Sequence, residues 1–176
     1  MTELGGGAVA LPRDPYAVVL EMGTTLACTL DPDEVAQAIA RQVGEALDVQ
    51  SCDINEYDAD ARAFTYVAVW SKELRRVDTD YVGTVVSLDE RPERDAVLRA
   101  GDVLETYVDD EGLDPRERAM MLEFDEQAVM EVPLTFGGEI LGVLGVSDSG
   151  RKRRFTEQEK ELLRLIAGPA ATALGN

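Results

Sequence analysis

The sequence predicts an α+β domain, in which an antiparallel sheet carries helices on its faces. Residues 128–146 read as two β-rich runs around Gly137-Gly138, a pair that accepts the positive φ angles of a tight primed turn. Residues 51–58 and 64–70 form a second pair of strand-like runs with a short connection. Strands joined by short turns pair antiparallel, and the helical periodicity on either side of these hairpins completes the α+β pattern.

The hairpin around Gly137-Gly138 is apolar on both faces. Counting back from a two-residue turn, Leu134 pairs with Leu141, and Val132 pairs with Val143. A hairpin with two apolar faces belongs in the middle of a sheet that is covered on both sides.

Glu131 is the exception on that hairpin, because it is an acid at mid-strand on an otherwise apolar face. Burying an unpaired carboxylate is costly, so we expect Glu131 to meet a basic side chain, a ligand's polar group or a face that is open to water. The candidate basic partners in the middle of the chain are Arg75, Arg76, Arg94 and Arg99.

Helices are predicted at both ends of the chain. The first begins at residue 14, with Pro15 in its first turn, and is broken at Asp31, which caps a second helix. The last begins after Thr156, which forms a capping box with Glu159. Pro169 is expected to bend or interrupt that helix, because proline lacks an N–H donor. The apolar positions expected on the inner faces are Val18, Val19, Met22, Leu26 and Leu30, then Val35, Ile39, Val43 and Leu47, and finally Leu162, Leu163, Ile166, Ala170 and Ala173.

The middle of the chain, between the two hairpins, is variable and acidic. It reads as alternating short strands and short helices, and it is the natural cover for the sheet face that the end helices leave open. The elements expected there are one of unspecified type at 81–88, a helix at 91–100, a strand at 103–108 and a helix at 115–124.

Length and composition set the domain organisation. The 176 residues suffice for one domain with a core, which we assign to residues 14–176. Residues 1–13 are glycine-rich and aperiodic, and we expect a flexible segment there. No run reaches the roughly 18 apolar residues that cross a membrane. No signal pattern opens the sequence, so we expect a cytoplasmic location and no membrane partner.

The charge of the chain bears on its partners. A formal net charge of −18 disfavours nucleic acid, because phosphate binding needs clustered lysine and arginine. The one basic cluster, residues 151–154, precedes the last helix. We interpret it as a solvated loop, with a contact to an acidic partner as the alternative.

Histidine is absent, and the only cysteines are Cys28 and Cys52. The absence of histidine excludes imidazole catalysts, histidine-ligated haem and the common zinc sites that contain histidine. The two cysteines lack metal-binding spacing, so we predict no metal site and no cofactor. Cys52 is interpreted as a small buried core residue.

Several of these segments, in this order, resemble the GAF domain family over nearly the whole chain, from about residue 16 to residue 174. The resemblance implies a profilin-like central antiparallel sheet of five or six strands, with the N- and C-terminal helices on one face. It also implies a small-molecule pocket beneath short helices and loops on the other face. The residues that carry it are Val132-Pro133-Leu134, Gly137-Gly138, Ile140-Leu141-Gly142-Val143-Leu144, Phe155-Thr156, Glu159, Leu162-Leu163 and the opening Leu30-Asp31-Pro32-Asp33-Glu34-Val35.

The resemblance implies a non-catalytic sensor that binds an unidentified small molecule and signals through its end helices, as a homodimer. An alternative from another class is an interaction or dimerisation module whose pocket is collapsed. A third hypothesis is an enzyme, since one branch of the family reduces free methionine sulfoxide through pocket cysteines.

Known ligands of the family fit this sequence poorly. Bilin-binding members attach the chromophore to a cysteine beside a histidine, and haem-binding members ligate iron through histidine, which this chain lacks. Cyclic-nucleotide-binding members tend to carry an Asn-Lys pair followed by a Phe-x-x-x-Asp-Glu string. Here Glu159-Lys160 follows Phe155 instead, and no Asn-Lys pair precedes it.

Eight residues are candidates for the pocket, chosen because they are aromatic, thioether or acidic side chains in or beside the middle segment. For each of them the alternative is ordinary packing. Regular alternation along residues 64–70 places the first two on one face of their strand. The candidates are Tyr66, Trp70, Tyr81, Tyr107, Met120, Met121, Phe124 and Glu131.

Overall fold

The computed structural model describes residues 14–26, 31–73, 76–77, 80–90, 92–149 and 152–175. The predictions for residues 1–13, for Cys28 and Leu30 and for Arg75 concern residues outside these ranges. The elements, in chain order, are α1 (Pro15–Leu26), α2 (Pro32–Leu47), β1 (Ser51–Asp58), β2 (Ala63–Ser71), β3 (Arg76–Val77), β4 (Val85–Ser87), the 3-10 turn η1 (Leu88–Glu90), α3 (Pro92–Ala100), β5 (Leu104–Tyr107), α4 (Pro115–Glu123), β6 (Glu126–Phe136), β7 (Glu139–Ser149) and α5 (Glu157–Gly175).

The strands form one antiparallel sheet in the order β3-β2-β1-β7-β6-β5, and the three-residue β4 also pairs with β2. The β6–β7 hairpin lies inside the sheet, because β7 also pairs with β1 and β6 also pairs with β5. The predicted α+β class, the antiparallel sheet and the central position of this hairpin are therefore confirmed.

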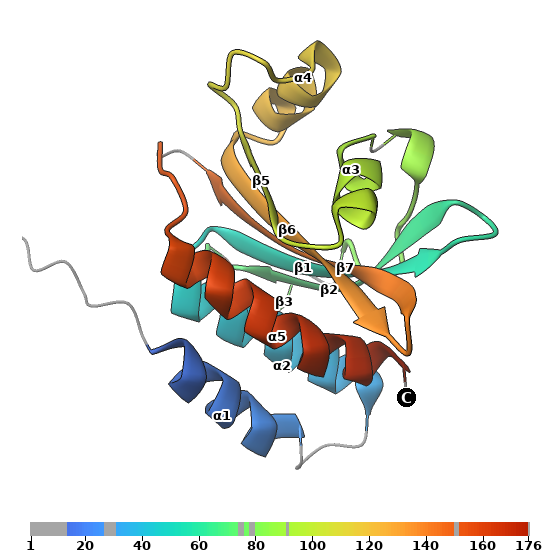
Figure 1. The fold of residues 1–176 in the computed structure, drawn as a ribbon, viewed down its shortest axis with the longest axis vertical. Helices are drawn as coiled ribbons and strands as arrows, with labels where there is room; N and C mark the ends of the chain where they lie inside the picture. Colours follow the sequence, from blue (N-terminus) through green and yellow to red (C-terminus); the bar gives the residue numbers. More distant parts are fainter. Residues whose placement is uncertain are drawn as a thin grey trace, which may run out of the picture.

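The two faces of the sheet carry different covers (Figure 1). Helices α2 and α5 lie side by side on one face, and α1 packs against these two helices rather than on the strands. Helices α3 and α4 lie on the opposite side. The end helices do share one face, as predicted, but α1 forms an outer layer there. Among the described residues, no helix combines the length and the apolar character that crossing a bilayer requires.

Most of the core lies between the sheet and the α2–α5 layer. Ile39 and Val43 of α2 and Leu163 and Ile166 of α5 are fully or almost fully buried there. A smaller core lies on the other face, where Phe64, Leu88, Val97 and Val143 pack together. This second core fixes α3 over the sheet.

The turn of the β6–β7 hairpin is as predicted, but its register is not. Gly137 and Gly138 adopt φ angles of 61° and 89°. Beyond the turn, Leu134 pairs with Gly142, not with the predicted Leu141, and the pairs from Leu134 back to Ala128 are shifted by one residue. The cause is a bulge beside Leu134, which leaves one residue of β7 unpaired.

A second bulge changes the faces of β2. Ile54 pairs with Ala68, and the next residue of β1 pairs with Tyr66, so Val67 is the extra residue. Tyr66 therefore faces α3 and α4, whereas Trp70 faces α2. The predicted placement of both rings on one face is wrong, because alternation fails at a bulge.

In the basic connection before α5, Lys152 and Arg154 are 75% and 54% exposed, as expected for a solvated loop, but Arg153 is not. The side chain of Arg153 is only 16% exposed, and its guanidinium donates to the buried carboxylate of Asp148, to Glu159 and to the Leu47 carbonyl. Arg154 lies over the Tyr107 ring and pairs with acidic residues of the β5–α4 connection. Arg153 therefore joins β7, α2 and α5, which corrects the solvated-loop interpretation for this residue.

Helix α5 begins as predicted, directly after Thr156. Thr156 and Glu159 form a reciprocal capping box, with bonds of 2.7 Å from the Thr156 backbone N–H and 3.2 Å from the Glu159 backbone N–H. The helix continues through Pro169 to Gly175. Interruption at the proline did not occur, because residues on both sides pack in the core: Ile166 and Ala170 are almost fully buried.

Candidate functional site

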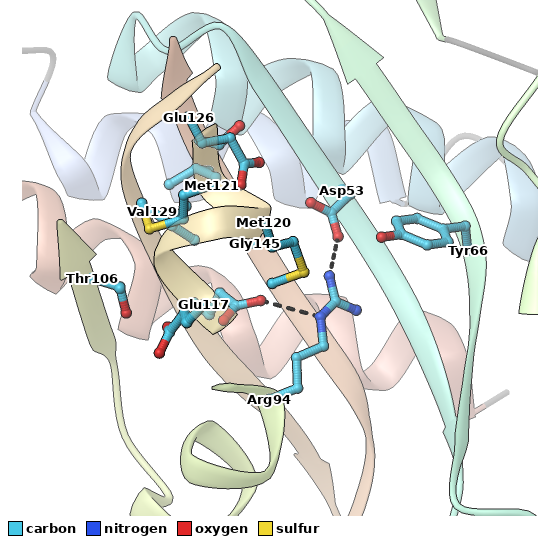
Figure 2. A pocket seen from close by; sticks show the side chains of 13 residues that line it. Asp53, Tyr66, Arg94, Thr106, Glu117, Met120, Met121, Glu126, Val129 and Gly145 are labelled. Atoms are coloured by element: carbon cyan, nitrogen blue, oxygen red, sulfur yellow. Dashed lines mark hydrogen bonds and ion pairs between the residues drawn. The ribbon is translucent and has the colours of Figure 1, made fainter. Parts of the chain in front are cut away.

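A cavity of about 60 Å³ lies on the sheet face opposite α2 and α5, beneath α3 and α4 (Figure 2). Strands from across the sheet form its floor, and the two short helices form its roof. The lining residues are Asp53 of β1, Tyr66 of β2, Thr106 of β5, Glu126, Val129 and Glu131 of β6, Gly145, Val146 and Ser147 of β7, Arg94 of α3, and Glu117, Met120 and Met121 of α4.

Arg94 is the central side chain of this site. Its Nη2 donates to Asp53 Oδ2 at 3.1 Å, a contact that Figure 2 draws as a dashed line. Its Nε lies 3.3 Å from Glu131 Oε1. The side chains of Arg94 and Glu131 are 5% and 8% exposed, so this ion pair is shielded from water.

Two aromatic rings complete the surroundings of the Arg94 guanidinium. Its central carbon lies 5.1 Å from the centroid of the Phe64 ring and 5.5 Å from that of Tyr66. A guanidinium at this range is attracted by the negative face of the ring. Asp53, Glu131, Phe64 and Tyr66 together form what we call the Arg94 cage.

The local sequence explains why Arg94 points into the sheet. Pro92 opens α3, and Gly101, at a φ of 65°, ends it. Val97 lies one helical turn after Arg94, and residues three apart share a helix face. Because Val97 is fully buried in the smaller core, the same face carries Arg94 down to the strands.

The floor of the cavity depends on Gly145. A Cβ at this position would lie 3.2 Å from Asp53 Oδ1 and 3.5 Å from Glu131 Cγ. Any side chain at this position would therefore crowd the two acidic residues that hold Arg94. Beside them Asn55, which is fully buried, donates its side-chain amide to Asp53.

The lining is acidic. Among the described lining residues, four carry carboxyl groups and one, Arg94, carries a positive charge. No group of three or more cysteine, aspartate or glutamate side chains in the described part of the chain could hold a metal ion. The acidic side chains of the lining are Asp53, Glu117, Glu126 and Glu131.

The Cys52 thiol lies away from the cavity. It is fully buried in the large core on the α2–α5 face, as expected for a packing residue. Burial raises the pKa of this thiol well above its ordinary value, and the neighbouring Asp53 carboxylate raises it further. A raised pKa keeps the sulfur protonated and unreactive at neutral pH.

Four of the eight candidate pocket residues line the cavity: Tyr66, Met120, Met121 and Glu131. The partner of Glu131 is Arg94, one of the four arginines considered for it.

The other four candidates lie elsewhere. Trp70 packs against Gly44 of α2, on the opposite face. Tyr107 is buried near α5, where its hydroxyl accepts from the Phe155 backbone N–H at 2.9 Å and donates to Glu105 at 2.9 Å. Tyr81 and Phe124 are 50% and 49% exposed and do not contribute to the lining.

Sequence reasoning missed Asp53 as a site residue and did not place Arg94 over the cavity. Asp53 and Asn55 are two polar residues on one face of a strand whose other face is apolar. That alternation was a usable signal, because polar side chains on a strand that lies within a sheet need partners. The remaining residues missed were Thr106, Glu117, Glu126, Val129, Gly145, Val146 and Ser147, for which the sequence carries no comparable signal.

The family model described as "GAF domain" matches residues 31–174. No curated protein sequence matches the chain. Among solved structures, the phycocyanobilin-bound GAF domain from a cyanobacterial phytochrome is similar, with a TM-score of 0.79, 16% sequence identity, and coverage of 93% of this chain and 95% of that chain.

Two further solved structures share the fold. The GAF domain from an Acinetobacter phosphoenolpyruvate-protein phosphotransferase has a TM-score of 0.74 and 14% identity, over 92% of this chain and 92% of that chain. The chromophore-binding domain of a Stigmatella aurantiaca bacteriophytochrome has a TM-score of 0.78 and 14% identity over 98% of this chain, and this chain spans 64% of its length. At these identities the likeness concerns the fold alone.

Proposed function

Since the chain belongs to the GAF domain family, a fold used for signalling and small-molecule sensing, we propose that it is a non-catalytic sensor in the cytoplasm. A small molecule binds in the cavity between the sheet and the α3–α4 roof. Binding shifts the position of the roof, and the signal leaves through the end helices of a homodimer.

The observation that carries this proposal is the cavity itself. It is roofed by two short helices and contains a buried ion pair, whereas most of the core lies on the other face of the sheet. Polar groups placed in a concave site orient a ligand, and short helices over a rigid sheet are elements that can move. A ligand that prefers one roof position shifts the population toward it.

The size of the cavity limits the ligand. A volume of about 60 Å³ is well below the roughly 300–1,000 Å³ of sites for drug-sized molecules. One of the similar structures carries phycocyanobilin. Because this chain has no histidine, we do not propose that chromophore as its ligand. A compound of a few non-hydrogen atoms fits without rearrangement.

The alternative, an interaction module whose cavity is collapsed, is favoured by the same small volume and by the position of Arg94 within it. The reductase hypothesis is the least supported, because the buried Cys52 thiol has a raised pKa and lies across the sheet from the cavity. These features support a non-catalytic role.

The proposed dimer is supported by the outer helix α1. Tyr16 and Leu20 are 67% and 74% exposed there, although both carry large apolar surfaces. Exposed apolar side chains on one helix are a feature of protein–protein interfaces. Sedimentation of a monomer at high concentration would remove the dimer from the proposal.

Native mass spectrometry of the freshly purified protein tests ligand binding, with Gly145→Val as the variant. A valine there fills the floor of the cavity beside Asp53 and Glu131. The matched control is Gly168→Ala, since a Cβ at Gly168 meets nothing within 4 Å.

We expect a bound small molecule in the wild type and in Gly168→Ala, and none in Gly145→Val. We also expect metabolite extract to raise the melting temperature of the first two proteins only. A wild type without a bound mass and without any such rise would leave the collapsed module as the better account.

A further inference from the structure

We propose that the cavity binds a small organic cation, a guanidinium or primary ammonium compound, in the place now held by the Arg94 guanidinium. This inference rests on the proposed function and names the chemical class of its ligand. Arg94 then acts as an internal stand-in for the ligand.

The Arg94 cage has the chemistry of a cation site. Asp53 accepts a hydrogen bond from Arg94 Nη2 at 3.1 Å, and Glu131 forms an ion pair with the guanidinium, its Oε1 lying 3.3 Å from Nε. The rings of Phe64 and Tyr66 lie 5.1 and 5.5 Å from its carbon. Carboxylates combined with aromatic faces recognise guanidinium and ammonium groups, because both supply negative potential.

The charge of the lining excludes the opposite class. The described lining residues carry four carboxyl groups and one cation, Arg94, and that cation is already engaged by two of the carboxylates. An anionic ligand would approach this acidic lining with no vacant positive group among those residues. In a partly buried site of low dielectric such repulsion is strong. A cation that takes the place of Arg94 leaves the charge of the cage unchanged.

The origin of Arg94 connects this exchange to the roof. Arg94 comes from α3, whereas both of its acidic partners belong to strands in the interior of the sheet. A ligand cation that satisfies Asp53 and Glu131 removes the polar tie between α3 and the sheet and leaves the apolar tie through Val97. Occupancy would therefore change the position of α3 without dismantling its core.

Arg94→Ala makes the exchange measurable, because it leaves both carboxylates in place and vacates the guanidinium position. The probe is methylguanidinium chloride. Urea, which is planar and neutral, controls for shape, and sodium chloride and sodium acetate control for ionic strength and for anions. Arg99→Ala is the matched variant, since Arg99 lies on the same helix with its side chain 70% exposed and pairs locally with Asp95.

We expect methylguanidinium to bind Arg94→Ala in calorimetric titration and to raise its melting temperature above the value in sodium chloride. Urea and acetate neither bind nor raise the melting temperature. Arg99→Ala keeps Arg94 in its place, so its response to methylguanidinium equals that of the wild type. Adding Asp53→Asn or Glu131→Gln weakens the binding about tenfold or more, as for loss of a hydrogen bond to a charged group. If Arg94→Ala is unfolded in sodium chloride, circular dichroism replaces calorimetry as the readout of the titration. We then expect methylguanidinium to restore the folded spectrum and urea to leave it unchanged.

Equal effects of methylguanidinium, urea and sodium chloride on Arg94→Ala would overturn the inference. So would a co-purified anion that is lost in Arg94→Ala, although that result would leave the proposed sensor function intact. A different result would contradict the proposed sensor function: a wild type that neither carries nor binds a small molecule, with the same mass spectrum and melting temperature as Gly145→Val.

Discussion

Arg94 Nε lies 3.3 Å from Glu131 Oε1, and both side chains are more than nine-tenths buried. This pair joins α3 to β6, on the face of the sheet that holds the smaller of the two cores. A buried charge whose partner is removed is more costly than the intact pair, because the remaining charge keeps its desolvation penalty.

Replacing Arg94 by methionine tests that cost. The methionine keeps much of the apolar volume and leaves Asp53 and Glu131 without their shared cation. We expect the free energy of unfolding to fall by about 3 to 5 kcal/mol, measured by urea denaturation at pH 7.

The control for this variant is Arg99→Ala on the same helix. Its exposed ion pair with Asp95 contributes about 0.5 kcal/mol or less, so the midpoint is expected to stay almost unchanged. Equal losses for the two variants would contradict the distinction between a buried and an exposed pair.

Gly44 lies where α2 meets the Trp70 ring, and a methyl group at Gly44 would overlap carbon atoms of the indole. Gly44→Ala is expected to lower the free energy of unfolding by about 1 to 3 kcal/mol, because overpacking forces side chains or backbone to shift. Trp70 fluorescence during urea denaturation reports both the stability and the local change.

Gly23→Ala is the matched helix substitution, since a Cβ at Gly23 meets nothing within 4 Å. There the expected change has the opposite sign, a gain of about 0.5 to 1 kcal/mol from helix propensity. Stabilisation by alanine at both positions would show that α2 is not in close contact with the indole.

Thr156→Ala removes one half of the capping box of α5. The Thr156 hydroxyl accepts from the Glu159 backbone N–H at 3.2 Å. We expect a loss of about 1 kcal/mol in the free energy of unfolding, the usual effect of removing an N-cap side chain.

Thr172→Ala in the same helix is the comparison. Its exposed hydroxyl donates only to the Gly168 carbonyl, inside the helix, so its removal is expected to change stability by less than about 0.5 kcal/mol. A larger loss there than at Thr156 would argue against the importance of the cap.

Cys52 is expected to make stability depend on alkaline pH. Burial holds the pKa of its thiol above the ordinary value, so the thiol stays protonated in the folded state while the unfolded chain ionises it. The stability is therefore full below about pH 8.5 and falls above it, by about 1 kcal/mol at pH 9.5.

The measurement compares two variants, Cys28→Ser and Cys28→Ser with Cys52→Ala, by urea denaturation at pH 7.5 and pH 9.5. The first is expected to lose more stability than the second over this range. Its Cys52 thiol is also expected to react with a thiol reagent only when the protein unfolds. Rapid labelling of the folded protein at pH 7.5 would be inconsistent with a buried thiol.

Local signals were sufficient for most of the fold. The Gly137-Gly138 turn, the Thr156–Glu159 capping box and the Asp31 cap depend on residues within a few positions of each other, and all three formed as predicted. The apolar spacing of α2 likewise placed its inner face correctly, from Val35 to Leu47.

The predictions of strand register and of side-chain facing were wrong at β-bulges, where one strand carries an extra residue. A bulge beside Leu134 shifted the β6–β7 pairs, and a bulge at Val67 separated Tyr66 from Trp70. Bulges are set by how two strands fit each other, so a period of two read from one strand does not reveal them.

The site was only half predictable for a different reason. Glu131 was identified because an acid in an apolar strand requires a partner. Its partner could be narrowed only to a set of arginines, because the choice depends on how α3 packs over strands that are distant in sequence. Arg153 was misread in the same way, since its acidic and carbonyl partners come from three different elements.

The extra residue at Val67 lets one strand serve both layers of the domain, with Tyr66 turned toward the roof and Trp70, four positions on, turned toward the helices. A substitution within this stretch keeps that arrangement, but loss of the extra residue would turn both rings toward the same face of the sheet. The number of residues between the two aromatic positions therefore matters more to this two-layer arrangement than the identity of the residues between them.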